Sequence, residues 1–168
     1  SGELRSALQV HGPVDALGKA LREALSRIGR HYAGITSGIN AGMPEDPLQF
    51  SCQTNYTLLT TDGYWNSNGS QDLSGASVGN QDNANSGYTT RAVGAYDGSL
   101  SGASDTLADT AAYYYKTDLR TSGPVSSNNV PTNTKDVAPH QHMVTFTLGL
   151  GLEGLMDYLP DYETNTSG

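Results

Sequence analysis

Apolar residues recur every three to four positions near the start of the chain, and this spacing predicts an amphipathic helix over about residues 15–33. Asp15 is placed to cap the start of this helix and Gly34 to end it. Arginines lie between the apolar positions and supply a polar face. The apolar positions are Leu17, Leu21, Leu25, Ile28 and Tyr32.

A second, shorter helix is predicted after a glycine-rich stretch. Ser104 and Asp105 offer a cap for it, and its pattern runs to about Lys116. One side of this helix carries Leu107, Ala111 and either Tyr114 or Tyr115. Three consecutive tyrosines, residues 113–115, cannot all face a core from a helix, so at least one should reach the surface, a partner or the following loop.

Two short apolar runs predict buried strands. The first covers about Thr54 to Thr61 and stops at Asp62, which a glycine follows. The second covers Met143 to Leu150 and is also followed by a glycine. Helix, strand, helix and strand then alternate along the chain, which predicts a parallel α/β sheet with helices packed against it. Ligands of such sheets bind beyond the carboxyl ends of the strands, so Asp62 is a candidate site residue.

Long polar insertions separate these elements, at about residues 64–103 and 118–139. Both exceed ordinary loops, which indicates segments that are either functional or poorly ordered. Arg91 to Tyr96 is a candidate short strand in the first insertion, and Glu3 to Val10 a candidate short helix before the first long one. Residues 1–168 fit a single domain, or a fragment of one, with these insertions.

Composition narrows the classes of partner. A net charge of −8 and a pI near 4.7 disfavour nucleic acid and anionic lipid, and favour cationic partners or metal ions. Only 15% of residues are charged, so the polar surface rests on uncharged side chains, as in secreted and cell-surface proteins. No apolar run is long enough for a transmembrane segment, and the start at Ser1-Gly2 is typical of an excised or processed piece. Cys52 stands alone and is predicted to be buried.

Four ordered motifs together resemble the PilY/PilC family of type IV pilus tip adhesins, from about residue 17 onward. The motifs are Cys52-Gln53-Thr54-Asn55-Tyr56; Thr61-Asp62-Gly63-Tyr64-Trp65-Asn66; Thr106-Leu107-Ala108-Asp109-Thr110-Ala111 with Tyr113-Tyr114-Tyr115-Lys116-Thr117-Asp118-Leu119-Arg120; and His142-Met143-Val144-Thr145-Phe146-Thr147-Leu148-Gly149-Leu150-Gly151.

The resemblance implies a von Willebrand factor A-like domain, which is a Rossmann-like parallel sheet with helices. It also implies an extracellular place at the pilus tip, with roles in surface adhesion, pilus assembly and twitching motility. The implied partners are minor pilins or other pilus proteins, and a host or abiotic surface ligand. In such domains a first strand with its serine motif precedes the helix at 15–33, so the fold is expected to be incomplete here.

The same resemblance implies a metal-ion-dependent adhesion site, in which Asp62 matches the aspartate ligand for Mg²⁺ or Ca²⁺. The place of the expected threonine ligand holds Gly18-Lys19 instead, and a lysine ammonium there would repel a cation and take its position beside Asp62. Asp97, Ser99 and Ser101 form a literal Asp-x-Ser-x-Ser pattern in a glycine-rich linker. A rearranged metal site and a solvated loop both remain open for that segment.

Two other groups of polar residues resemble metal sites more weakly. His140 and His142 alternate as two zinc ligands on a strand would, yet no third ligand stands nearby, which favours a satisfied or solvent-facing pair. Four side chains between residues 80 and 85 lack the carboxylates of a calcium loop, so solvated turns are favoured; they are Asn80, Asp82, Asn83 and Asn85.

Three functional hypotheses follow from the sequence. The first is a non-catalytic adhesion and assembly module of a pilus tip protein. The second is a structural pilus-tip subunit with no metal-dependent binding, whose insertions pack against other pilus proteins. The third, an extracellular metal-dependent hydrolase, requires metal ligands beyond Asp62, and the chain shows no nucleophile motif.

Overall fold

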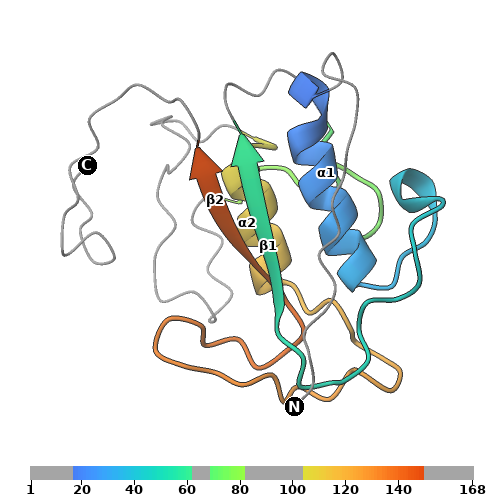
Figure 1. Ribbon diagram of the computed structural model, residues 1–168, viewed down its shortest axis with the longest axis vertical. Coiled ribbons are helices and arrows are strands. Elements are labelled where there is room, and N and C mark those ends of the chain that lie inside the picture. The colour runs from blue at the N-terminus through green and yellow to red at the C-terminus, as the bar shows by residue number, and fades with distance from the viewer. Residues whose placement is uncertain (1–16, 62–68, 82–103, 150–168) are drawn as a thin grey trace.

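The computed structural model describes residues 17–61, 69–81 and 104–149 (Figure 1). Its elements are the helices α1 (Leu17–Tyr32) and α2 (Leu107–Lys116), a short 3₁₀ helix η2 (Gly38–Asn40), and the strands β1 (Asn55–Thr61) and β2 (Met143–Gly149). Both helices and both strands predicted from the sequence are present in the predicted order. Neither described helix combines the length and apolarity that a membrane span requires.

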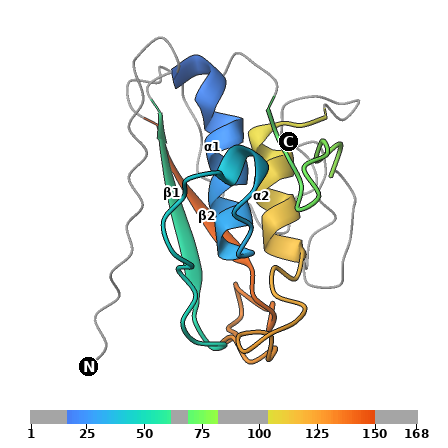
Figure 2. The same ribbon diagram turned by 90° about the vertical axis from the view of Figure 1, so that its right-hand side faces the viewer.

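The two strands form a parallel sheet, as the alternation of elements predicted. Asn55 pairs with Met143 at one end and Thr61 with Gly149 at the other. Both helices lie on the same side of this sheet (Figure 2). The structure is therefore two layers, with helices over one face of the strands and no described element over the other.

Helix α1 ends at Tyr32, and the predicted stop residue Gly34 follows two positions later with a positive φ of 74°, which favours a residue without a side chain. The amide of Ile35 donates back to the carbonyl of Arg30 at 2.9 Å, which satisfies an acceptor that the last helical turn leaves free. The chain can then turn away from α1 toward η2 and β1.

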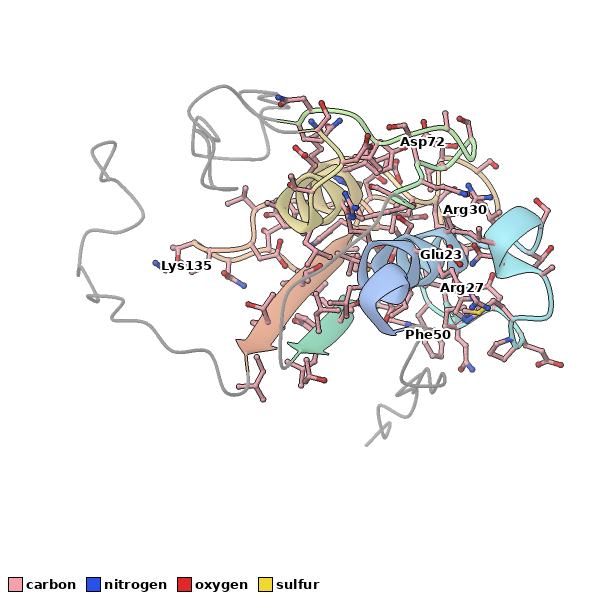
Figure 3. All side chains as sticks on the ribbon, turned by 90° about the horizontal axis from the view of Figure 1, so that it is seen from above. Glu23, Arg27, Arg30, Phe50, Asp72 and Lys135 are labelled. Atoms are coloured by element: carbon pink, nitrogen blue, oxygen red, sulfur yellow. The ribbon has the colours of Figure 1, made fainter. Side chains whose placement is uncertain are left out.

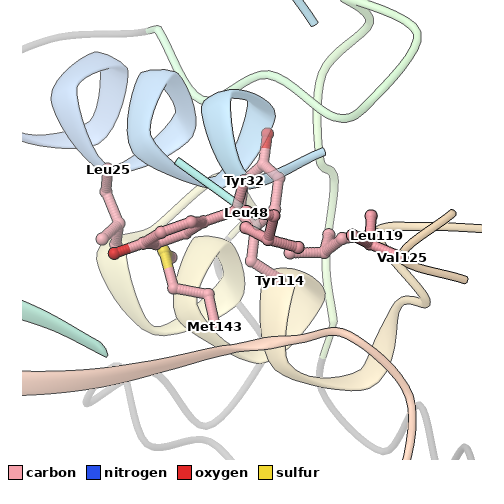
Figure 4. Packing of buried hydrophobic residues seen from close by; sticks show 7 residues of the cluster. All are labelled: Leu25, Tyr32, Leu48, Tyr114, Leu119, Val125 and Met143. Atoms are coloured by element: carbon pink, nitrogen blue, oxygen red, sulfur yellow. The ribbon is translucent and has the colours of Figure 1, made fainter. Parts of the chain in front are cut away.

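The core lies between the helices and the inner face of the sheet (Figure 4). Tyr114 of α2 is fully buried in it, and Leu107 and Ala111 of the same helix pack against it, as the helical spacing predicted. The two helices approach so closely that a Cβ atom added to Gly29 would overlap the Tyr114 ring. The other core residues are Leu25, Tyr32, Leu48, Leu119, Val125 and Met143.

Helix α2 begins one or two residues later than the sequence predicted. Thr106 is the N-cap: its Oγ1 accepts from the amide of Asp109, and the Asp109 carboxylate accepts from the amide of Thr106. This reciprocal capping box replaces the predicted cap at Ser104 and Asp105. The Asp105 carboxylate instead accepts from the Ser77 hydroxyl and the Gly79 amide, because it points to the neighbouring segment.

The described part of the first insertion, residues 69–81, packs along both helices. The buried Arg30 of α1 donates from Nη1 to the carbonyls of Asp72 and Leu73, at 2.6 and 3.1 Å. Figure 3 shows Arg30 directed toward the segment that carries Asp72. The Tyr114 hydroxyl donates to the carbonyl of Gln71 at 2.5 Å. Residues 69–81 are therefore fastened to both helices by hydrogen bonds from the buried side chains of Arg30 and Tyr114.

The second insertion, residues 118–139, has no helix or strand, yet it is packed onto the fold. Val125, Val130 and Ala138 are buried. The amide of Leu119 donates to the carbonyl of Gln141 at 2.9 Å, and that of Val130 to the carbonyl of Pro139 at 3.0 Å. This connection therefore has its own apolar anchors between α2 and β2.

The predicted burial of Cys52 is wrong, because this thiol is exposed. Residues 51 and 52 form a turn in which the amide of Gln53 donates to the carbonyl of Phe50 at 3.1 Å. The turn directs the Cys52 side chain to the surface before β1 begins.

Candidate partner-binding face and strand ends

The carboxyl ends of the two strands lie side by side, as a site at this edge requires. Thr61 is the last residue of β1 and pairs with Gly149, the last residue of β2. Asp62, the predicted metal ligand, follows Thr61 directly, and it lies outside the described residues. The predicted strand end is therefore confirmed, while the position of the Asp62 carboxylate stays a prediction.

The other residues nominated for a cation also lie outside the described part of the chain. They are Asp97, Ser99 and Ser101. The candidate strand from Arg91 to Tyr96 and the side chain of Lys19, which was predicted to repel a cation, lie outside the described part as well. Among residues 17–61, 69–81 and 104–149, no three His, Cys, Asp or Glu side chains are grouped as a metal site requires.

The outer face of the sheet, which we define as Tyr56, Leu58, Phe146 and Leu148, is apolar and exposed. These side chains keep 51, 64, 54 and 48% of their surface accessible, respectively. Leu58 pairs with Phe146 across the strands, and the rings of Tyr56 and Phe146 lie 5.9 Å apart. Four large apolar side chains from two strands therefore make one continuous surface.

This exposure corrects the prediction that both strands are buried. Side chains alternate between the two faces of a strand, and only the odd-numbered positions point toward the helices. Asn55, Thr57 and Met143 occupy that inner face and are buried. The even-numbered positions carry the apolar side chains and point away. The sequence shows that the odd positions of both strands are mostly polar, but this alternation does not tell which face the helices cover.

A closed ring of hydrogen bonds joins α2, the second insertion and the residues leading into β2. The Tyr115 hydroxyl donates to Asp136 Oδ1 at 3.1 Å, and His142 Nε2 lies 3.0 Å from the same oxygen. His142 Nδ1 lies 2.7 Å from the carbonyl of His140, and His140 Nε2 lies 3.3 Å from the carbonyl of Tyr115. We call these four residues the His–Asp–Tyr ring.

The ring confirms that the two histidines are a satisfied pair. His140 and His142 are 2% and 1% exposed, so neither reaches a solvent-borne substrate or metal ion. Burial lowers the pKa of His140, and the neighbouring His142 lowers it further. Tyr115 packs under the following connection, one of the outcomes predicted for the tyrosine triplet. The ring therefore has a structural arrangement, with no accessible acid, base or nucleophile.

Known proteins resemble the chain over most of its length. The type IV pilus biogenesis factor PilY1 of Pseudomonas aeruginosa strain PAK is 33% identical over 160 residues, covering 80% of this chain and 13% of the relative. PilY1 of strain PAO1 is 34% identical over 163 residues, with the same coverage of both chains. PilY1 of strain UCBPP-PA14 is 34% identical over 151 residues, covering 80% of this chain and 12% of its own.

The two other comparisons add no relative. No family profile matches the chain, and no solved structure matches it. The chain spans about an eighth of the length of the curated relatives and matches one region of those longer proteins. The identity over four-fifths of this chain, together with the ordered motifs, shows that the chain belongs to the PilY/PilC family.

Proposed function

We propose that this chain is a non-catalytic assembly module of a type IV pilus protein and binds a partner pilus protein through its outer face. The exposed apolar surface of Tyr56, Leu58, Phe146 and Leu148 carries this proposal. Parallel sheets in folded proteins are normally covered on both faces, so this surface is one that a further protein element covers. The names of the PilY1 relatives support placing that partner in the type IV pilus.

The area of the outer face favours a different protein, rather than a second copy of this chain, as the partner. Aromatic side chains have about 150–250 Å² of surface each and leucines less, so two aromatic and two leucine side chains that are half exposed offer at most roughly 400 Å². A stable complex buries about 800 Å² on each partner. Two copies that meet through this face alone would bury less area than a stable complex requires. A partner that also contacts the surrounding surface can bury the required area.

Charge defines the partner further. The chain carries a net charge of −8, so a partner with basic side chains around an apolar ridge approaches it favourably. The four outer-face residues are themselves uncharged, which leaves the centre of the contact apolar. The proposed partner is therefore a pilus protein, such as a minor pilin, with an apolar ridge and a basic rim.

The proposal is tested by introducing a negative charge on the outer face of the sheet and, as a control, on the opposite face. The double variant Leu58→Asp with Phe146→Asp should abolish binding to purified minor pilins of the same bacterium, measured one at a time by biolayer interferometry. Thr147→Asp is the matched control, because Thr147 is exposed on β2 but belongs to the opposite face. The double variant should also reduce the number of pili per cell when placed in the full-length protein. Unchanged binding and pilus number in the double variant would refute the proposal.

A von Willebrand A-like fold and a cation at Asp62 form a second, separable proposal. The end of β1 at Thr61, beside the end of β2, supports it, since Asp62 then starts at the ligand-binding edge of the sheet. Adhesion to a surface ligand would depend on that cation. Titration calorimetry with Mg²⁺, Ca²⁺ and Mn²⁺ should show binding heat that Asp62→Ala removes, while pilin binding through the outer face persists. No heat with any of the three ions excludes the cation and leaves the assembly module untouched.

A further inference from the structure

The outward side of the sheet is a grid of six positions, three from each strand. The cross-strand pairs are Tyr56 with Val144, Leu58 with Phe146, and Thr60 with Leu148. Five of these six side chains are apolar, and the polar exception, Thr60, lies near the carboxyl ends of the strands. Val144 is half-buried and the other five are exposed. An element that covers this side therefore meets a nearly continuous apolar strip that follows the strands.

The dimensions of this strip fit one α-helix. Its length from residue 56 to residue 60 is about 13 Å, because each residue advances a strand by about 3.3 Å. A helix covers that length in about nine residues, and its turns recur every 5.4 Å or so, close to the roughly 6.6 Å between successive outward side chains of a strand. A helix is about 10 Å wide, which spans two strands that lie roughly 4.8 Å apart. One helix along β1 and β2 thus covers the whole strip.

The covered face of the same sheet favours a helix over a strand as the partner element. Helices α1 and α2 both lie against that face (Figure 2). Parallel sheets in α/β proteins carry helices on both faces. A strand added to the edge of β1 or β2 would pair with main-chain groups and leave outward side chains such as Leu58 and Phe146 exposed. Only an element laid over the face removes their apolar surface from water.

We infer that the partner element is an amphipathic α-helix with cationic flanks, which lies along β1 and β2 over the outer face. Its apolar residues recur at positions i, i+3, i+4 and i+7, so that one stripe of the helix contacts the strip. Lysines and arginines flank this stripe, because the chain carries a net charge of −8 while its outer-face residues are uncharged. This inference rests on the proposed function and specifies which element of the pilus partner binds there.

Two synthetic peptides of equal composition test the shape of the partner element. Both consist of leucine and lysine and have about 18 residues, a length that supports a helix in water. One peptide repeats leucine with the period of a helix, and the other alternates leucine and lysine with the period of a strand. We expect the helical peptide to bind this chain at least about tenfold more tightly in fluorescence anisotropy. Equal affinities, or tighter binding of the alternating peptide, overturn the inference.

Charge substitutions show whether the helical peptide uses the outer face. Leu58→Asp with Phe146→Asp should abolish its binding, whereas Thr147→Asp on the opposite face should not weaken it. Both variants add negative charge, so attraction by charge alone would strengthen with either, and a loss limited to the double variant isolates the apolar contact. Thr60→Lys replaces an exposed polar side chain, so it leaves the fold intact and should still weaken the cationic peptide. Undiminished binding to both outer-face variants overturns the inference.

Cross-linking to a minor pilin separates this inference from the proposed function. Cys52→Ser removes the exposed native thiol, and Thr60→Cys places a thiol within the strip. Single cysteines scanned along the pilin that loses binding to the double variant should cross-link at every third or fourth residue. Cross-links at every second residue, or confined to one loop, overturn the inference while the assembly proposal stands. Pilin binding that survives the double variant refutes the pilin as the partner, and the two peptides alone then decide whether a helix fits this face.

Discussion

At the scale of single residues, the contact between Gly29 and Tyr114 sets the distance between the two helices. The Tyr114 ring fills the space that a side chain on Gly29 would occupy, and its hydroxyl donates to Gln71 in the first insertion. Burial raises the pKa of this phenol, so it stays neutral and a donor across the physiological range. One ring thus fixes helix packing and anchors residues 69–81.

Gly29→Ala should lower the free energy of unfolding by about 1–2 kcal/mol. The added methyl favours the helix by up to about 1 kcal/mol, but overpacking against a fully buried ring costs about 1–3 kcal/mol. Urea denaturation followed by circular dichroism measures the difference. Glu23→Ala on the same helix is the control and should change stability by less than about 0.5 kcal/mol. A Gly29→Ala chain as stable as the unaltered one would show that α2 can shift away.

At the scale of elements, the start of α2 depends on a buried capping box. Thr106 and Asp109 are 2% and 3% exposed, and the Asp109 carboxylate also accepts from the amide of Gln81 at 2.7 Å. The cap therefore does two tasks, since it begins the helix and holds the end of the segment at residues 69–81. The sequence pattern predicted Ser104 and Asp105 as the cap, because the tertiary partners of Thr106 and Asp109 cannot be read from local sequence.

Thr106→Ala should cost about 1–2 kcal/mol of stability, because it leaves the amide of Asp109 without its acceptor. Thermal and urea denaturation of the two chains give the comparison. Ser104→Ala is the matched control: Ser104 is exposed and lies two residues before the true cap, so its loss should be neutral. Equal losses for both substitutions would contradict the assignment of Thr106 as the cap.

At the scale of the whole molecule, buried histidines make stability depend on pH. Burial lowers the pKa of His31, with Arg120 acting in the same direction and Asp46 opposing it. Burial and His142 lower the pKa of His140. In the unfolded chain both histidines take up protons near pH 6.5. The unfolded state then binds more protons than the folded one, so stability is complete above that pH and falls as the pH drops through it.

The free energy of unfolding should therefore be lower at pH 5.5 than at pH 7.5. The loss is at most about 1.4 kcal/mol for each histidine at one pH unit below 6.5. Urea denaturation at the two pH values measures it, and His31→Gln with His140→Gln should flatten the dependence. A further loss of stability is expected below about pH 4, where Asp46 becomes protonated in the unfolded chain. Burial raises the pKa of Asp46 in the folded chain, but the net effect of its contacts, including that with Arg120, is to lower it. Higher stability at pH 5.5 would contradict this account.

Local patterns in the sequence determined the elements and their order. Apolar spacing placed α1 and α2 within one or two residues, Gly34 marked the end of α1, and apolar runs placed β1 and β2. Those features follow from short-range physics: helical periodicity, capping and strand propensity act over a few residues. The order of elements then indicated a parallel sheet, because such crossovers have few alternatives.

Only the tertiary structure decided which face of each strand is covered and which polar groups meet. An apolar run predicts burial, yet Leu58 and Phe146 are exposed because both helices lie on the opposite side of the sheet. Asp136 joins Tyr115 and His142 across the second insertion, a contact that depends on how residues 118–139 return to β2. Burial and long-range hydrogen bonds are set by the positions of whole elements, which no local pattern in the chain encodes.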